Sequence, residues 1–470
     1  MTNLVLVPDV LVVAAAMLIL IAGRLGWVPR SSRRYLPAIT AAIALVAFGI
    51  ELWAGAALTT YFDGALVQDR FALFAKAAAL LTAAIVLAAT DWAAEDSLSI
   101  GLAMPLIAAF GVMVAASARD LVGLWAGLEL TAASAMVMVS LRRPDLGLRL
   151  LVAGAVGSGL VLIGLAFVYA TTGNADLPLI QGVLAHTIPT LPLAIPVLLV
   201  MSGLAVRAGI APFHSANLSA GLGGSPLGAG MLLGLVAFSV AIVAIKLTAA
   251  LVAVSAVYSV FFEVLAGVAM LGGGAAALAV RAPRMRLSYL AVAQFGWVAA
   301  GLATHYRAGL AGSLFLLGAF AVAATCGPAV LGAAGGGEEA VHGLAAVRPA
   351  RAAGLALAML SLAGAPPLAG FFGELAVGAA LAQGGRFALL AIGLLGWTLG
   401  LVAAVGTLRV LYVQSPLEDA RRGAAAALPV LSRLSTAGVL AFCLVIAAYG
   451  VLANPIMGLA DQGAEALGLR

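Results

Sequence analysis

The sequence predicts an all-α, polytopic membrane protein of about 14 transmembrane helices. Of its 470 residues, 64% are hydrophobic and only 9% are charged, and the mean hydropathy is +1.16. Soluble domains carry about 25% charged residues. Apolar runs of the roughly 20 residues needed to cross a bilayer follow one another along the whole chain. Arginines gather in alternate loops, as expected when successive helices cross the membrane in opposite directions.

Fourteen apolar runs are long enough to be spans. They lie at 4–23, 35–55, 68–90, 98–117, 120–141, 147–171, 190–211, 226–252, 255–280, 287–305, 308–333, 350–384, 387–413 and 430–453. The first follows Met1–Thr2–Asn3 without a basic region, so we expect a retained span rather than a cleaved signal peptide. No polar stretch is long enough for a separate soluble domain, which predicts one transmembrane domain over residues 1–470.

The loop arginines predict the orientation. On one side of a fourteen-span arrangement lie Arg24, Arg30, Arg33, Arg34, Arg142, Arg143, Arg281, Arg284, Arg286, Arg348, Arg351, Arg421, Arg422 and Arg433. The opposite loops hold Arg70, Arg119, Arg307, Arg386 and Arg470. Because cytoplasmic loops are enriched in Lys and Arg, both termini are expected on the non-cytoplasmic side of a bacterial inner membrane.

Two spans are expected to be interrupted at their centres by proline. Pro212 follows Val206–Ala211, and Pro366 and Pro367 lie in the middle of the twelfth span. Proline removes a helical hydrogen bond, and at membrane depth the freed backbone groups must be satisfied by protein or by a water-lined cavity. Interrupted helices five spans apart are typical of inverted-repeat transporters. We therefore expect repeats over spans 4–8 (96–252) and 9–13 (253–413), flanked by 1–95 and 414–470. The alternative is two ordinary proline kinks.

Ionisable side chains lie inside several apolar runs. A charged residue at the centre of a membrane helix costs about 2.5–3.5 kcal/mol on insertion scales, so such residues are usually functional. The candidates for a proton path are Glu129, Arg149, Arg207, His214, Lys246 and Glu374, with Lys76 as a further intramembrane charge. Glu129 and Arg149 come from consecutive spans and could form a pair.

Structural alternatives remain open for four of these residues. Arg149 and Lys246 lie near helix ends, from which long basic side chains can extend to the interface. Lys76 is either structural or functional. His214 either holds a proton or caps the interrupted helix.

Other chemistry has little support. The net charge of +5 is spread over short loops and does not indicate nucleic-acid binding. Cys326 and Cys443 fit no disulfide or metal spacing. We find no nucleotide-binding loop, no haem or iron–sulfur ligand set and no nucleophile constellation, so no cofactor and no metal are expected in this chain. Energy for transport would come from a partner or an ion gradient.

The chain resembles the antiporter-like membrane subunits of respiratory complex I (NADH:quinone oxidoreductase), most closely the N-type subunit, a family related to Mrp-type antiporter subunits. The motifs that carry the resemblance are, in order, Phe62–Asp63–Gly64, Asp69–Lys76, Asp120–Leu130, Leu148–Gly154, Gly203–His214, Arg286–Tyr289 and Ser361–Phe371. The resemblance covers nearly the whole chain. It implies a translocase subunit without a redox centre, placed in the membrane arm beside M-type and small core subunits, with quinone bound elsewhere in the complex.

The departures from the family pattern concern the proton path. The central lysine of span eight falls at Val236 or Ala237, and the histidine of span ten is Gln294. Glu374 replaces the lysine after the second break, as in the M-type subunit. The lysines of spans six and seven are Arg149 and Arg207, and arginine stays charged and cannot pass a proton on.

Three functions remain open on these grounds. In the first, water held by neutral groups such as Ser239 and Gln294 bridges Glu129 and Glu374, and the chain takes part in proton translocation. In the second, the chain is a non-conducting structural subunit with a degenerate path. In the third, it belongs to a cation/proton antiporter or a membrane-bound hydrogenase.

Overall fold

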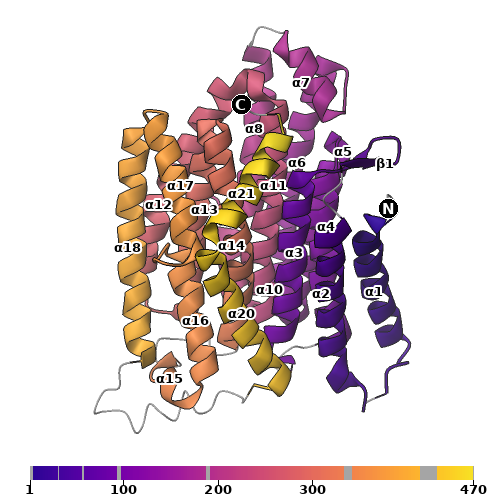
Figure 1. Cartoon of the computed structure of the whole chain (residues 1–470), viewed down its shortest axis with the longest axis vertical. Coiled ribbons are helices and arrows are strands. Elements are labelled where there is room, and N and C mark those ends of the chain that lie inside the picture. Colours follow the sequence, from indigo (N-terminus) through magenta and orange to yellow (C-terminus); the bar gives the residue numbers. More distant parts are fainter. Residues whose placement is uncertain are drawn as a thin grey trace.

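The protein is a bundle of long helices (Figure 1). The computed structural model describes residues 4–29, 31–54, 58–92, 97–186, 191–332, 341–412 and 431–468. Within these ranges, 12 helices are long and apolar enough to cross a membrane. The prediction of a polytopic all-α membrane protein is therefore confirmed. The two predicted spans outside this set are the seventh and twelfth, which are the interrupted ones. Arg30, Arg421, Arg422 and Arg470 lie outside the described residues.

The described part of the first half contains a short two-stranded sheet and eleven α-helices. Its elements are α1 (Val7–Arg24), η2 (Arg33–Tyr35), α2 (Leu36–Ala54), β1 (Thr59–Tyr61), β2 (Leu66–Gln68), α3 (Arg70–Ala89), α4 (Leu98–Ser117), α5 (Leu121–Arg142), α6 (Pro144–Thr172), α7 (Leu177–Ala185), α8 (Leu191–Ala208), α9 (Ser215–Gly223), α10 (Pro226–Met231), η4 (Leu232–Val236) and α11 (Ala237–Ala250). The segment η4 is a π-helix between α10 and α11.

The described part of the second half is helical. Its elements are η5 (Val252–Val254), α12 (Ser255–Ala279), α13 (Pro283–Thr304), α14 (Arg307–Leu331), α15 (Leu344–Val347), α16 (Pro349–Leu362), α17 (Ala369–Gln383), α18 (Phe387–Tyr412), α20 (Arg433–Val451) and α21 (Ala453–Ala466).

Polar residues before the apolar runs start several helices. The Asp69 carboxylate accepts a hydrogen bond from the Ala72 amide at 2.7 Å and caps α3. Asp120 caps α5 by accepting from Val122 and Gly123, both at 2.9 Å. Such caps satisfy backbone donors that have no partner in the first turn of a helix. The same residues that punctuate the apolar pattern in the sequence therefore set where these helices begin.

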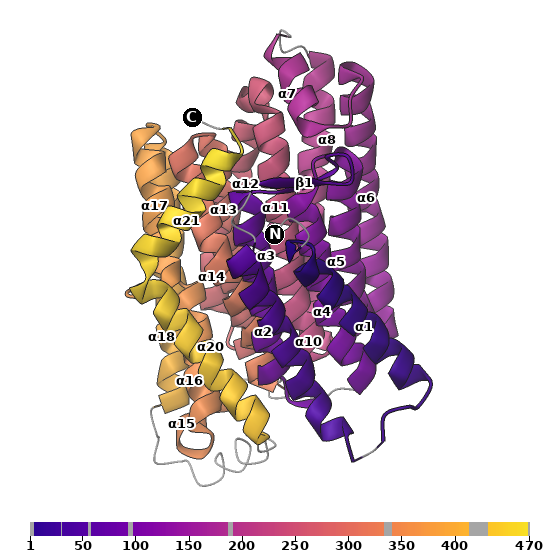
Figure 2. The same ribbon diagram turned by 45° about the vertical axis from the view of Figure 1, so that its right-hand side comes forward.

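The centre of the bundle is formed by α14 and the α10–η4–α11 segment, whose apolar windows are wholly buried. The N-terminal helices α1 and α2 lie at one edge and α18 at the opposite edge (Figure 1). Figure 2 shows α20 and α21 running obliquely across one side of the bundle. Arg307 anchors α21 on α14 by donating to both carboxylate oxygens of Asp461, at 2.8 and 2.6 Å. These hydrogen bonds hold the pKa of Asp461 below its ordinary value.

Both helix breaks lie next to the prolines. At the first break, α8 ends at Ala208 and α9 begins at Ser215; at the second, α16 ends at Leu362 and α17 begins at Ala369. In each break a glycine with positive φ, Gly209 or Gly364, precedes a cis X–Pro bond. The first break differs from the prediction in position, because it follows a helix of 18 residues rather than dividing one at its centre. The second divides its span into helices of 14 and 15 residues.

Two glycines of a run in α12 lie in close contact with neighbouring helices. A Cβ on Gly274 would lie 3.0 Å from the Gly396 carbonyl carbon on α18, and a Cβ on Gly273 would lie 2.7 Å from the Ala293 amide nitrogen on α13. Nothing lies within 4 Å of the same position at Gly272. Two of the three glycines therefore allow close helix packing, as in other membrane bundles.

We expect Gly274→Ala to destabilise the protein by about 1–3 kcal/mol, the usual range for overpacking a filled core. The reason is that the added methyl group meets backbone atoms of α18, which cannot rotate away. Thermal unfolding in detergent measures the effect. Gly272→Ala is the matched control in the same run and should leave the unfolding temperature unchanged or slightly higher, because alanine favours helix. Equal effects of the two changes would contradict this packing.

Candidate functional site

Glu129 lies on α5 in a polar site made by three helices. Its Oε1 is 2.8 Å from Arg207 Nη2 near the end of α8, and it also accepts a hydrogen bond from the Ser158 hydroxyl on α6. The Arg207 side chain is 10% exposed and that of Glu129 is 30% exposed. The pair is thus largely enclosed by the chain, with the carboxylate as its more accessible end. The contact with Arg207 is an ion pair, and the hydrogen bond from Ser158 is the one that holds the carboxylate oxygen in place.

Glycines on α6 make room for the Arg207 side chain. A Cβ on Gly157 would lie 2.9 Å from Arg207 Cγ, and one on Gly154 would lie 2.6 Å from Nη1. A Cβ on Gly203 of α8 would likewise lie 2.8 Å from the Val161 amide nitrogen on α6. The small residues bring α6 and α8 together and let the guanidinium cross α6 to reach α5. Local sequence therefore positions Arg207, rather than Arg149, at Glu129.

The predicted pairing of Glu129 with Arg149 is wrong. Arg149 is near the start of α6 and is exposed, while the carboxylate turns to α8. Consecutive helices are neighbours, but the side of α6 that carries Arg149 does not face Glu129. Arg149 fits the structural alternative of a long side chain directed to the interface.

A cavity of about 200 Å³ adjoins the Glu129–Arg207 pair. Glu129, Ser158, Arg207 and Asn217 line it on the polar side, and Val236 lies on its wall. Asn217, in the first turn of α9, donates its amide to the Arg207 carbonyl at 3.4 Å. One carbonyl near the first helix break is thereby satisfied by a side chain, as the membrane setting requires.

A second polar site lies at the other break. Gln294 on α13 donates to the Ser361 carbonyl at 2.9 Å, and the Trp397 indole on α18 donates to the Gly364 carbonyl at 3.0 Å. The Glu374 carboxylate packs against Gly364, where a Cβ would lie 2.6 Å from its Cδ. Glu374 is buried, and its Oε2 has no hydrogen-bond partner among the described residues. These three side chains border a void of about 10 Å³.

His214 stands at the N-cap position of α9 but makes no capping hydrogen bond through its side chain. Its ring instead packs edge-on against Tyr289 of α13, with centroids 5.8 Å apart. The capping alternative is therefore not supported. His214 joins the first break to the second half of the chain.

The Lys246 side chain is buried rather than extended into solvent from the end of its helix. Its Nζ is buried and donates to the carbonyls of Ala116 and Ala118, at 2.6 and 2.5 Å. These carbonyls end α4, so the ammonium caps a helix C-terminus, where a cation is favoured. Lys246 also borders a cavity of about 560 Å³ with Asp69 and Arg119.

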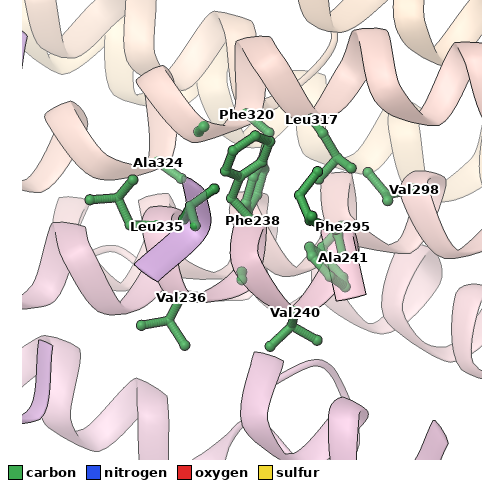
Figure 3. Close-up of a cluster of buried hydrophobic side chains, with 14 of the residues drawn as sticks. Leu235, Val236, Phe238, Val240, Ala241, Phe295, Val298, Leu317, Phe320 and Ala324 are labelled. Atoms are coloured by element: carbon green, nitrogen blue, oxygen red, sulfur yellow. The ribbon is translucent and has the colours of Figure 1, made fainter. Parts of the chain in front are cut away.

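Apolar side chains fill the region of the missing span-eight lysine (Figure 3). Val236 and Ala237 are 2% and 3% exposed, and Phe238 is fully buried. Phe238 lies in a cluster with Leu235, Phe295 and Phe320 (Figure 3). The ring centroids of Phe295 and Phe320 are 5.7 Å apart. We call this group, together with Val236, Val240, Ala241, Val298, Leu317 and Ala324, the central apolar cluster.

The predicted bridge through neutral polar groups finds limited support around this cluster. Ser239 is fully buried, and its hydroxyl has no hydrogen-bond partner among the described residues. Gln294 uses its amide to bind the Ser361 carbonyl. The space next to Ala237 and Phe238 is filled by side chains, whereas Val236 also lines the cavity beside Glu129. A continuous row of polar groups is therefore not visible there among the described residues.

Three residues of these sites were missed by sequence reasoning. Ser158 and Asn217 are common residue types without a distinctive pattern, and Trp397 is a single aromatic residue in a long apolar run, where packing or an interfacial position is the ordinary interpretation. Its position on the helix after the second break is the one signal that could have found it, because a buried indole N–H needs an acceptor. Each of the three donates a hydrogen bond, Ser158 to the Glu129 carboxylate and the other two to backbone carbonyls near the helix breaks.

Together, the fold and the sites define a polytopic helical membrane protein with interrupted helices and buried ionisable side chains. Such features mark ion pathways in membrane proteins. Residues 118–400 match the family described as NADH:quinone oxidoreductase/Mrp antiporter, TM. The chain belongs to this family.

The relatives agree in length with the chain. NADH-quinone oxidoreductase subunit N of Granulibacter bethesdensis is 30% identical, with 98% of each chain covered. NAD(P)H-quinone oxidoreductase subunit 2 of Thermosynechococcus vestitus is 27% identical and covers 97% of this chain and 92% of its own.

Solved structures share the fold. A chain of the Mrp complex from Dietzia sp. DQ12-45-1b superimposes with a TM-score of 0.84 at 19% identity, covering 99% of this chain and 98% of its own. A chain of respiratory complex I from Thermus thermophilus gives a TM-score of 0.77 at 21% identity, covering 97% of this chain and 99% of its own.

Proposed function

We propose that this chain is an N-type, antiporter-like subunit in the membrane arm of an NADH:quinone oxidoreductase or a close relative, and that it takes part in proton translocation coupled to quinone reduction. A relative named NADH-quinone oxidoreductase subunit N matches 98% of the chain. The observation that carries the proposal is the Glu129–Arg207 pair beside a cavity at a helix break. In this proposal the chain holds no cofactor, electron transfer and quinone binding occur in other subunits, and M-type and small core subunits are its neighbours.

The finer architecture belongs to the same proposal. Fourteen spans would comprise three N-terminal spans (1–95), two inverted five-helix repeats (96–252 and 253–413) and a C-terminal span (414–470). The two breaks support the repeats, because each has a glycine with positive φ three residues before a proline, Gly209 before Pro212 and Gly364 before Pro367.

The Glu129–Arg207 pair is suited to respond to charge at the edge of the chain. The carboxylate is the more exposed partner and can sense a neighbouring subunit, whereas Arg207 keeps its charge and is enclosed. A change of charge beside Glu129 alters the strength of the ion pair, since Coulomb interactions are strong where water is excluded. Arg207 would then transmit the change in ion-pair strength to the first helix break, because the Asn217 side chain beyond the break is hydrogen-bonded to the Arg207 carbonyl.

A second candidate function is a subunit that couples its neighbours without conducting protons through its own centre. The filled central apolar cluster favours this candidate, because Val236 and Ala237 offer no titratable group between the sites of Glu129 and Glu374. Here the chain still takes part in translocation by transmitting an electrostatic or conformational signal.

The partners of the chain test the proposal. An affinity-tagged full-length chain should co-purify, in mild detergent, with subunits that carry iron–sulfur clusters and a quinone-reactive site. Purification with cation/proton antiporter subunits alone, or with a membrane-bound hydrogenase, would replace the proposal with the corresponding alternative.

The proposed orientation places the Arg33–Arg34 loop in the cytoplasm. In a background with Cys326 and Cys443 replaced by alanine, Ser32→Cys should react with a membrane-impermeant maleimide only from the cytoplasmic side. Ala65→Cys, in the hairpin at the other end of α2, is the matched control and should react only from outside. Labelling of Ser32→Cys from outside would reverse the orientation.

A further inference from the structure

The three N-terminal helices contain a charged cluster that lies apart from both helix breaks. Asp9, in the first turn of α1, forms an ion pair with Lys76 on α3, with 2.9 Å between Oδ2 and Nζ. The Lys76 side chain is 2% exposed and that of Asp9 is 14% exposed. The pair therefore ties α1 to α3, with the aspartate as the end closer to solvent.

Glu51, near the end of α2, completes this cluster. Its side chain is fully buried, and its Oε1 accepts a hydrogen bond from Gln68 Nε2 at 2.6 Å. Gln68 is the last residue of β2, and the β-hairpin pairs it with Thr59. The other carboxylate oxygen, Oε2, is buried and has no hydrogen-bond partner among the described residues.

The charges of the cluster do not balance when all groups are ionised. Lys76 and Asp9 are the charged groups that act on Glu51, and Gln68 is its hydrogen-bonding neighbour. The adjacent helix α4 has no ionisable side chain. Because Lys76 already neutralises Asp9, an ionised Glu51 would leave one buried negative charge without compensation. Such a charge is far costlier than a neutral carboxylic acid, and a proton on Oε2 removes the cost.

We propose that Glu51 is a reversible proton-binding site in the N-terminal helices, additional to Glu129 and Glu374. The proton binds to Oε2 and neutralises the carboxylate. On release it passes to water at the Asp9 end of the cluster, and the negative charge left on Glu51 is then shared with Asp9 around the Lys76 ammonium. This inference does not require conduction through the centre of the chain, and it can hold even if the proposed function is wrong.

Infrared difference spectroscopy of the purified full-length protein in its native complex tests the proposal. Spectra recorded at two pH values should contain a C=O stretching band of a protonated carboxyl that shifts in D2O. Glu51→Gln should remove this component. The matched control is Glu465→Gln, an exposed carboxylate bound to Arg307, which should leave the band unchanged. A band of equal size in wild type and Glu51→Gln would overturn the proposal.

Two neighbouring substitutions keep the test valid if Glu51→Gln does not fold. Lys76→Gln removes a cation, so the protonated-carboxyl band should persist to higher pH than in wild type. Asp9→Asn removes an anion and frees Lys76 for Glu51, so the band should disappear at lower pH. Shifts of opposite sign would support direct electrostatic coupling to Glu51. Shifts in the same direction, or none, would overturn the proposal, because a purely structural cluster has no reason to titrate in this way.

Discussion

Ala237→Lys is expected to remove most of the correctly folded protein from the membrane. Ala237 is 3% exposed and follows the π-helix directly, within the apolar core. An ammonium forced into such a site without a partner costs several kcal/mol even after relaxation, against a total stability of about 5–15 kcal/mol for a typical domain. The amount of folded chain in membranes and its unfolding temperature measure the effect.

Two controls separate charge from size. Ala237→Met adds a similar length without a charge and should cost about 1–3 kcal/mol, the range for overpacking. Val236→Lys should be tolerated better than Ala237→Lys, because Val236 lines the cavity that also holds Glu129. If Ala237→Lys accumulates normally and increases proton flux, the centre of the chain is hydrated and the apolar cluster is not a barrier.

Arg207→Met is expected to destabilise the protein more than the double variant Arg207→Met with Glu129→Gln. The single change leaves the Glu129 carboxylate without its cation, whereas the double change removes both charges. Breaking one partner of a buried pair costs about 3–5 kcal/mol. The effect here should lie toward the lower end, because the Glu129 side chain is 30% exposed.

Unfolding of the two single variants and the double variant forms a double-mutant cycle that isolates the pair. Additive effects would mean that the two side chains do not interact in the folded protein. Arg149→Met provides a comparison in the same region, and its exposed position predicts little change.

The sequence predicted the helices and both breaks because these depend on local chemistry. Apolar runs mark membrane helices whatever their neighbours are, and a proline disrupts a helix at its own position. The hairpin at 59–68, the short helix α7 and the α21 extension were missed, because they are too short or too polar to stand out in a search for spans. The π-helix η4 also has no local signal. Its Gly234 lies against the backbone of Thr325 on α14. Thr325 is distant from Gly234 in the sequence, so this contact cannot be recognised from the local pattern.

The charged site was predicted only in part for a related reason. Glu129 and Arg207 could be recognised as costly charges, but their pairing depends on how closely α6 and α8 approach. That approach is set by Gly157 and Gly203 on different helices. Likewise, Lys246 lies near a helix end in the sequence, yet the bundle buries that end against α4. Which helix faces which charge is a property of tertiary packing.

Glu129, held by Arg207, is in this proposal a working group of proton translocation. Its most direct test is the number of protons pumped per electron in proteoliposomes that contain the purified complex with Glu129→Gln. The amide keeps the shape of the side chain but loses the negative charge, so we predict a lower proton-to-electron ratio with the complex fully assembled. Glu465→Gln serves as the control and should pump as wild type. An unchanged ratio in the assembled Glu129→Gln complex would contradict the claim and leave Glu129 with a structural role.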